Sequence, residues 1–420
     1  DNAIIGVDIG TTSTKTIAYD EKGNILAEAD REYPLYSPAS TWKEQDPEEI
    51  FQAVLTTLAN VLKTVAEQNR SVAGVGFSAA MHSLIAVGGN GKLLTRAIVW
   101  ADQRAARESE ELKASGVGHE IYLRTGVPIH PMSPLTKLLW FRKHQNHIYQ
   151  AASKWISIKE YVFYRLFHQY VADYSIASAT GLFHLKKLDW DEEALQLTGI
   201  TKDQLSVLVP TTHIVTGLDP EIAGFLHIPA DTPFVVGASD GVLANLGVGA
   251  IEQGSVACSI GTSGAIRTVV PEPVTDPKGR IFCYALTEDQ WVIGGPINNG
   301  GVSLRWLRDQ VLPELKDKIE SLGGHPYDEM TKLASSANPG ADGLLFLPYL
   351  MGERAPYWNA DTKGVFIGLT LNHGQKEIIR AVLEGVIFQM YTVVLALKDM
   401  GVEPFEYRAN GGFAKSELWR

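Results

Sequence analysis

Two short turns, far apart in the chain, combine the residue types that bind phosphate. Each reads Ile-Gly-Thr followed by a second hydroxyl residue, at positions 9–12 and 260–263. Each lies between two apolar runs typical of strands, so we expect a tight turn inside a β-hairpin. Glycine lets a ligand approach the main chain, while turn amides and hydroxyls donate to phosphate oxygens. One such turn is more simply an ordinary hairpin, but the pair predicts two phosphate-binding loops. The first loop consists of Gly10, Thr11 and Thr12, and the second of Gly261, Thr262 and Ser263.

Two acidic residues stand in apolar surroundings. Asp8 lies in the strand-like run before the first loop, where a carboxylate without a partner is costly to bury. A Mg²⁺ ion beside the phosphates would give it a partner, and the alternative is an ion pair with Lys15 across the hairpin. Lys15 could instead add positive charge beside the loop. Asp240 follows another strand-like run and precedes Gly241, which by itself indicates a helix N-cap.

Paired glycines precede expected helices at two further places, 298–309 and 409–419. Both segments could present helix N-terminal amides to a nucleotide. The alternative for each is a glycine-rich turn from strand to helix that serves close packing. Neither the P-loop pattern nor G-x-G-x-x-G after a strand occurs, so neither a P-loop fold nor a dinucleotide-binding fold is expected.

The elements that must position these residues follow from periodicity. Asp46 and Pro47 predict the start of a helix whose apolar residues share one face. Helical segments are expected to dominate from about 104 to 206. A strand run, a hairpin turn and a second strand run open both halves of the chain, which suggests a duplicated domain with a boundary near 247–254. The expected strands span 4–10, 14–20, 25–33, 72–78, 83–89, 232–238, 255–261 and 263–270.

Composition narrows the classes of partner. The chain has 420 residues, of which 45% are hydrophobic and 20% are charged, and its net charge is −11. This balance indicates a globular protein of two domains and argues against a nucleic-acid or anionic-membrane partner. Cys258 and Cys283 form no zinc or disulfide pattern, so a reducing cytoplasm is expected. The apolar run at 385–397 is too short to span a bilayer, and no signal peptide is expected.

Two longer motifs resemble the signatures of the FGGY carbohydrate kinases, within the actin/hexokinase-like ATPases. They are "MSPLTKLLWFRKH" at 132–144 and "GVFIGLTLNHGQKEIIRAVLE" at 364–384. The resemblance implies an α/β fold with two RNase H-like domains, 1–248 and 249–420, and an active site in the cleft between them. It implies a kinase that uses ATP and Mg²⁺ and phosphorylates a small sugar or sugar acid, and a homodimer is left open.

The resemblance also assigns roles by position. Asp240 falls on the catalytic base and Asp8 on the acid associated with Mg²⁺. Gly301 falls where relatives contact ATP, and Gly411 and Gly412 fall where they hold the adenosine. The substrate-contacting positions correspond to Met81, His82, Trp100 and Met132.

Within the family the chain is most similar to the gluconokinases. The stretches that carry this likeness are 78–87, 126–140, 156–167, 171–183, 237–248 and 279–301. Gluconate has a carboxylate that must be recognised, for which His82, His130 and Arg104 are candidates. Arg104 has an alternative as an exposed helix residue facing Glu108 at i,i+4.

Departures from the family bear on the activity. Met81, His82, Ala265 and Gly241 replace residues that are typical of glycerol kinases, which argues against glycerol as the substrate. The chain ends at Arg420, soon after the adenosine motif, so we expect a second domain truncated at its C-terminus. A xylulokinase, or a non-catalytic protein that binds sugar or nucleotide, is the alternative.

Overall fold

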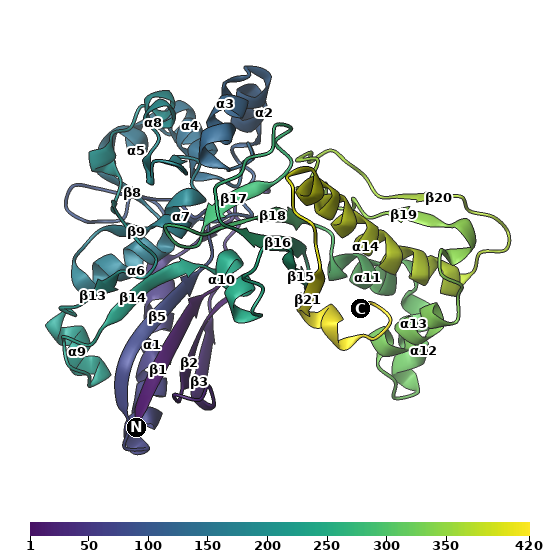
Figure 1. Cartoon of the computed structure of the whole chain (residues 1–420), viewed down its shortest axis with the longest axis horizontal. Coiled ribbons are helices and arrows are strands. Elements are labelled where there is room, and N and C mark those ends of the chain that lie inside the picture. The colour runs from purple at the N-terminus through teal and green to yellow at the C-terminus, as the bar shows by residue number, and fades with distance from the viewer. The chain divides into compact units, whose positions relative to one another are not determined.

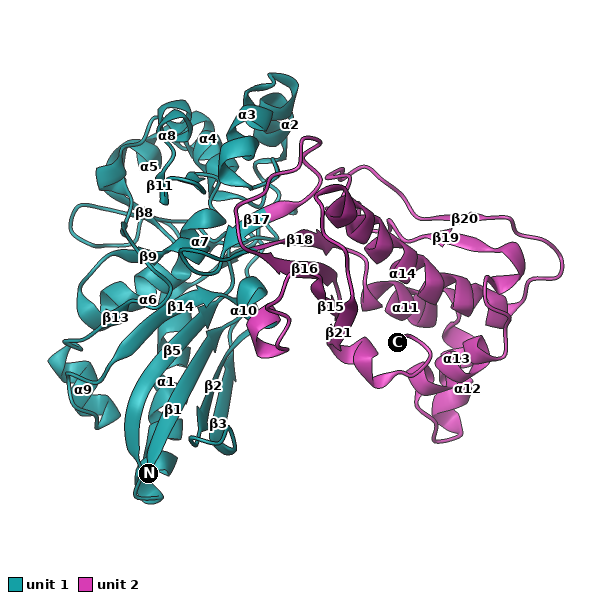
Figure 2. Ribbon diagram, viewed as in Figure 1, with its two compact units in different colours: residues 1–244, 283–291 teal, residues 245–282, 292–420 magenta.

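The computed structural model describes residues 1–420, which pack as two compact units. Unit 1 comprises residues 1–244 and 283–291, and unit 2 comprises residues 245–282 and 292–420 (Figure 2). The chain therefore crosses between the units three times. The return of 283–291 to unit 1 was not expected from the sequence.

A six-stranded sheet forms the centre of unit 1, in the order β13-β14-β5-β1-β2-β3 (Figure 1). β1 pairs antiparallel with β2 and parallel with β5, and β5 pairs parallel with β14. The expected hairpin and the two later strands are confirmed, and the structure adds that the later strands run parallel to β1. The strands are β1 (Asn2–Ile9), β2 (Ser13–Tyr19), β3 (Ile25–Glu32), β5 (Ser71–Ala79), β13 (Ile214–Val215) and β14 (Phe234–Ser239).

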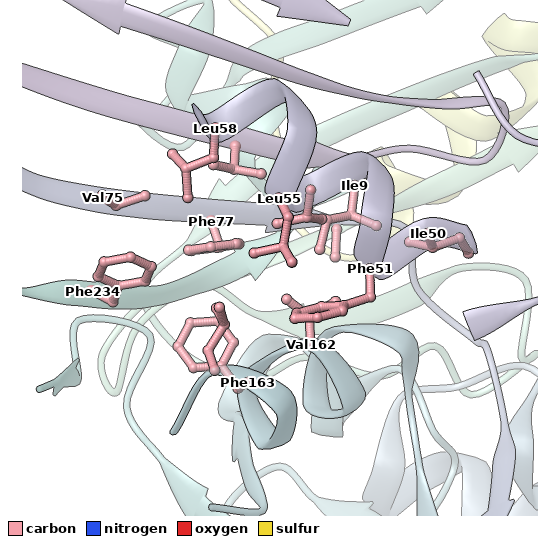
Figure 3. Close-up of a cluster of buried hydrophobic side chains, with 14 of the residues drawn as sticks. Ile9, Ile50, Phe51, Leu55, Leu58, Val75, Phe77, Val162, Phe163 and Phe234 are labelled. Atoms are coloured by element: carbon pink, nitrogen blue, oxygen red, sulfur yellow. The ribbon is translucent and has the colours of Figure 1, made fainter. Parts of the chain in front are cut away.

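Helix α1 (Pro47–Glu67) packs against this sheet and confirms the predicted start signal. The Asp46 side chain accepts a hydrogen bond from the Glu48 amide, and Pro47 opens the first turn. The apolar face of α1 is buried with strand residues and with α6 (Ile158–Phe167), and Phe77 meets Phe163 edge-on at 4.9 Å between ring centres (Figure 3). This core makes the centre of the sheet a rigid support for the residues at its edge.

The remainder of unit 1 is mainly helical, as expected, with short strand pairs between the helices. The predicted strand at 83–89 shortens to β6 (Ile85–Val87), which pairs with β8 (Lys154–Ile156) outside the main sheet. The helices are α2 (Ala106–Ala114), α3 (Val117–Thr125), α4 (Pro134–His144), α5 (Asn146–Ala151), α7 (Tyr174–Ser178), α8 (Glu192–Thr198), α9 (Pro220–Leu226) and α10 (Asp240–Gly247). The short strands are β4 (Glu44–Gln45), β7 (Ala97–Ile98), β9 (Val171–Asp173), β10 (Phe183–His184), β11 (Asp189–Trp190) and β12 (Val207–Val209).

Unit 2 repeats the opening pattern of unit 1. β15 (Ser255–Ile260) pairs antiparallel with β16 (Gly264–Val270) and parallel with β21 (Glu406–Asn410), as β1 does with β2 and β5. β18 (Trp291–Ile297) lies beside β16. The predicted duplication therefore extends from sequence to strand order.

Helices and a small strand pair complete unit 2. α14 (Gln375–Asp399) has 25 residues and is long and apolar enough to cross a membrane by length and composition. The expectation that the apolar run at 385–397 is too short to span a bilayer is therefore wrong for the whole helix. Within the most apolar window of α14, 56% is buried inside the protein. Its neighbours include α13 and β19, as in a core helix. The remaining elements of unit 2 are α11 (Gly301–Trp306), α12 (Pro313–Ser321), α13 (Pro326–Ser335), β19 (Leu345–Leu347) and β20 (Val365–Ile367). β17 (Phe282–Ala285) belongs from Cys283 onward to the returning segment of unit 1.

Candidate functional site

The register of the unit 1 sheet brings three candidate segments to one edge. Ile9 pairs with Ala79 on β5, and Ala79 pairs with Ser239 on β14. Each strand ends at or beside these residues. The first loop from Gly10, the Met81–His82 segment and Asp240 therefore start from adjacent strand ends, which is where ligands bind in sheets of this kind.

The first loop is a hairpin turn held by neighbouring side chains. The Gly10 amide donates to the Ser13 carbonyl oxygen over 2.9 Å, and the Tyr33 hydroxyl donates to the Gly10 carbonyl over 2.5 Å. The Thr11 hydroxyl accepts a hydrogen bond from the Trp100 indole nitrogen at 3.1 Å. Gly10, Thr11, Met81 and Trp100 also line one small cavity. Thr11, a predicted phosphate-binding residue, therefore lies close to Met81 and Trp100, which are predicted to contact the substrate. Thr12, the next residue of the loop, is exposed.

Asp8 and Lys15 face each other in the strand register but do not form an ion pair. The Lys15 ammonium instead lies 3.8 Å from a carboxylate oxygen of Glu28. The alternative ion pair with Asp8 is therefore wrong. Asp8 is exposed, whereas the sequence predicts a carboxylate in a buried strand. Desolvation by nearby protein groups nevertheless raises the pKa of its carboxyl, while a hydrogen bond from Ser78 lowers it.

A single carboxylate without a cationic partner fits a Mg²⁺ ion held mainly by phosphates and water. The described residues contain no cluster of three or more His, Cys, Asp or Glu side chains that could hold a metal ion. Asp8 would therefore be one ligand of the ion, and phosphate oxygens and water would have to supply the others.

His82 has an uncommon main-chain conformation for a residue with a side chain. Its φ is +74°, and such strain concentrates at functional sites. The Nδ1 atom lies 2.8 Å from the Ala179 carbonyl oxygen, so Nδ1 carries a hydrogen and Nε2 gains one only on protonation. In His130 the Nδ1 atom accepts a hydrogen bond from the Met132 amide at 3.0 Å, so Nε2 carries the hydrogen. Met132 itself is fully buried.

Arg104 is placed differently from both of its predicted roles. It precedes α2, and its guanidinium is buried, donating to both carboxylate oxygens of Asp102 and, at 2.6 Å, to Glu44. The guanidinium also lies 4.0 Å from the centre of the Trp42 ring. Glu108 instead pairs with His144, so the i,i+4 interpretation is wrong. Two carboxylates already occupy the planar fork, which argues against its use for a substrate carboxylate.

A bulge in β14 sets the position of Asp240. The pairing of β14 with β5 shifts register between Val235 and Ala238, and Gly237 has a φ of +69°. A β-carbon at Gly237 would lie 1.7 Å from the Phe77 carbonyl oxygen, so only glycine fits. Asp240 is the first residue of α10 and is partly exposed.

The second loop is bound to the start of α11 by main-chain hydrogen bonds. The Gly301 amide donates to the Gly261 carbonyl at 2.7 Å, and the Gly300 amide donates to the Thr262 carbonyl at 3.1 Å. A β-carbon on Gly301 would lie 2.7 Å from the same Gly261 oxygen. The glycines here serve close packing, and their amides already have acceptors. The prediction that these amides bind a nucleotide gains no support.

A cavity of about 960 Å³ opens within unit 2. Four predicted nucleotide residues line it, namely Gly261, Thr262, Gly301 and Gly412. Gly411 adjoins them, although the expected helix after it is only a short 3-10 turn, Gly412–Lys415. The cavity is large enough for a nucleotide. Sequence reasoning missed the contribution of α13, which lines the cavity with Tyr327, Asp328, Thr331, Lys332 and Ser335.

A buried acid supports the segment that leads into α11. One carboxylate oxygen of Glu353 accepts hydrogen bonds from the amides of Asn298, at 2.6 Å, and Arg354, at 2.8 Å. The other oxygen is buried without a hydrogen-bond partner. Desolvation outweighs the hydrogen bonds and raises the pKa of Glu353 to about 7. No local pattern in the sequence marked this residue.

Known proteins match this chain over both units. The N-terminal domain of the FGGY family of carbohydrate kinases matches residues 3–247, and the C-terminal domain matches residues 256–420. Gluconokinase of Bacillus subtilis (strain 168) is 54% identical over 418 residues, which cover 99% of this chain and 81% of that protein.

Solved structures agree. Gluconate kinase from Lactobacillus acidophilus has a TM-score of 0.94 at 39% identity and covers 100% of this chain and 83% of its own. A ligand-bound xylulose kinase from Lactobacillus acidophilus gives the same values. The matches cover 99–100% of this chain, so the expected truncation of the second domain finds no support. The chain belongs to the FGGY family of carbohydrate kinases.

Proposed function

We propose that this carbohydrate kinase transfers the γ-phosphoryl group of ATP to the terminal hydroxyl of D-gluconate, giving 6-phosphogluconate and ADP. The observation that carries the proposal is the strand register that brings the first loop, Met81–His82 and Asp240 to one sheet edge. The relatives named for gluconate favour a sugar acid as the acceptor. The proposed domains are 1–248, with the acceptor residues and the first phosphate loop, and 249–420, with the other nucleotide residues. The segment 283–291 is the exception, because it packs in unit 1.

Asp240 is the proposed general base. It accepts the proton of the terminal hydroxyl as that oxygen attacks the γ-phosphorus in line, and the bond to the bridging oxygen breaks to release ADP. The transition state is largely dissociative, so positioning contributes more than basicity. The Gly237 bulge, which fixes the end of β14, supports this role for Asp240.

The cavity of unit 2 is the proposed nucleotide site. In this cavity the Thr262 hydroxyl would donate to phosphate oxygens, and Gly411 and Gly412 would contact the adenosine. Within unit 1, Thr11, Thr12 and Lys15 are the proposed phosphate ligands of the first loop. Asp8 would hold Mg²⁺, which neutralises phosphate charge when bound. The absence of an ion pair to Lys15 leaves the carboxylate available for that role.

The imidazoles of His82 and His130 are the proposed partners of the gluconate carboxylate. The Nε2 atom of His130 carries a hydrogen, and that of His82 gains one on protonation. A protonated His82 would make a charge-assisted hydrogen bond to a carboxylate, which xylulose lacks. Met81 and Trp100 would contact the carbon chain, whereas the predicted contact of Met132 gains no support because Met132 is fully buried.

A second candidate acceptor is xylulose. The ligand-bound xylulose kinase matches this fold as well as the gluconate kinase does, at the same identity. Recognition by His82 predicts the preference for gluconate, because a neutral ketose gives a protonated imidazole no ionic partner.

Release of ADP in the presence of gluconate, xylulose, ribulose and glycerol tests the proposal. Gluconate should give the highest kcat/KM. Asp240→Asn should lower kcat roughly 10²- to 10⁴-fold with little change in the KM for ATP. Asp231→Asn, an exposed acid before β14, is the matched control and should keep full activity. Wild-type turnover in Asp240→Asn would refute the base, and no turnover of any acceptor by the wild type would favour a non-catalytic binding protein.

A further inference from the structure

The side chain of Lys137 ends in the interior of unit 1 among main-chain oxygens. Lys137 lies on α4 and is 0% exposed. Its ammonium donates to the carbonyl oxygens of His82 at 2.7 Å and Met132 at 2.8 Å. It also donates to the carbonyls of Val99 at 3.1 Å and Ile98 at 3.3 Å. Three N–H groups thus serve four acceptors, so the ammonium is saturated.

These four carbonyls belong to three segments that are remote in sequence. His82 and Met132 are themselves predicted to contact the acceptor, and Val99 immediately precedes Trp100, a third such residue. The bonds from Lys137 span sequence separations of 55, 39, 38 and 5 residues. One atom therefore fixes the distances between the main chains of three acceptor segments.

A packing role alone does not account for a charge at this place. Desolvation lowers the pKa of Lys137 to about 7, with Asp102 raising it and Arg104 lowering it. An apolar side chain of the same length would fill the volume without that cost. It could not, however, hold the His82 carbonyl, whose residue has a strained φ of +74°.

We propose that Lys137 is a positioning residue, which sets the geometry of the sugar-binding site by tying His82, Val99–Trp100 and Met132 together through their carbonyls. The inference rests on the proposed function for the identity of the acceptor. Lys137 touches neither the acceptor nor the nucleotide, and its effect reaches the acceptor through these segments.

Lys137→Met tests the proposal by keeping the volume and removing every N–H donor. Because small displacements of positioning groups cost up to two orders of magnitude in rate, we expect kcat/KM for gluconate to fall about 10- to 100-fold. The KM for ATP should stay within about twofold, since no acceptor of the ammonium lies in unit 2. Lys137→Gln retains two N–H donors, so its kcat/KM for gluconate should lie between those of wild type and Lys137→Met. The glutamine variant also keeps the test possible if the methionine variant does not fold.

Leu138→Ala is the matched control, because Leu138 is fully buried on the same helix and bonds to none of these segments. It should lower the melting temperature while leaving the KM for gluconate unchanged. A kcat/KM for gluconate within twofold of wild type in both Lys137 variants would overturn the positioning role. An equal rise of the ATP and gluconate KM values would also overturn it.

The proposed function can fail separately. If the wild type phosphorylates another acceptor of the panel and not gluconate, the assignment of gluconate is wrong, and the same comparison is made with that acceptor. If gluconate is the acceptor and the Lys137 variants behave as wild type, only the positioning role is wrong.

Discussion

Replacing Glu353 with glutamine should change how the stability of the protein depends on pH. Glutamine keeps the shape of the side chain and the acceptor oxygen for the amides of Asn298 and Arg354. It removes the titrating group. Any pH dependence of the difference in stability between wild type and variant then reports on the carboxyl of Glu353 alone.

The magnitude follows from the pKa of this group. Burial raises the pKa of Glu353 from its ordinary value of 4.5 to about 7 in the folded protein. The folded state therefore holds more protons than the unfolded state between these values, and stability falls as the pH rises. The contribution is fully present below pH 4.5 and is lost as the pH passes through about 7. A shift of roughly 2.5 units corresponds to about 3 kcal/mol.

Urea unfolding of both proteins at intervals from pH 4.5 to pH 8 measures the effect. The free energy of unfolding of wild type relative to Glu353→Gln should fall by about 3 kcal/mol across this range and then level off. Ile319→Ala, at a buried apolar position of α12, removes no titrating group and should change stability by an amount that does not vary with pH. Parallel curves for wild type and Glu353→Gln would refute the reasoning.

Three further substitutions address separate parts of the site. Gly237→Ala puts a β-carbon 1.7 Å from the Phe77 carbonyl oxygen. In steady-state kinetics it should lower kcat about 10-fold or more and leave the KM for ATP unchanged. An unchanged kcat would contradict the role of the bulge. Gly301→Ala puts a β-carbon 2.7 Å from the Gly261 carbonyl and should raise the KM for ATP about 10-fold without changing that for gluconate; equal changes in both would point to general misfolding. Arg104→Lys loses the bidentate contact with Asp102 and should destabilise the fold by about 3 kcal/mol, as measured by urea unfolding. The ratio of gluconate to xylulose activity should stay unchanged. A changed ratio would restore Arg104 as a ligand of the substrate carboxylate.

Features encoded by local pattern could be predicted from the sequence. The hairpin of β1 and β2, the cap of α1 at Asp46 and the hairpin of β15 and β16 depend on residues close together in the chain. The predicted strand at 83–89 includes Gly88 and Gly89, whereas β6 ends at Val87. The amide of Gly88 instead closes a turn with the Lys92 carbonyl at 2.8 Å.

Features that depend on remote partners could not be predicted in this way. Spacing suggested Glu108 as the partner of Arg104, whereas the structure supplies Glu44, which lies 60 residues away. The four carbonyl acceptors of Lys137 lie on three segments whose approach no periodicity describes. The roles of the two loops and of Asp240 stay predictions, and the sheet register brings the first loop and Asp240 to one edge.

The return of residues 283–291 to unit 1 has a consequence for how the protein is made. The Cys283 amide donates to the Gly126 carbonyl at 2.9 Å, the Ala285 amide donates to the Ser178 hydroxyl at 2.9 Å, and the Tyr284 ring meets that of His82. A ribosome must therefore synthesise the first two strands of unit 2 before Cys283, Tyr284 and Ala285 can make these contacts in unit 1. A nascent chain released at residue 244 would carry the first loop and Asp240 but would lack these contacts, so the first half of the gene does not encode the whole of unit 1.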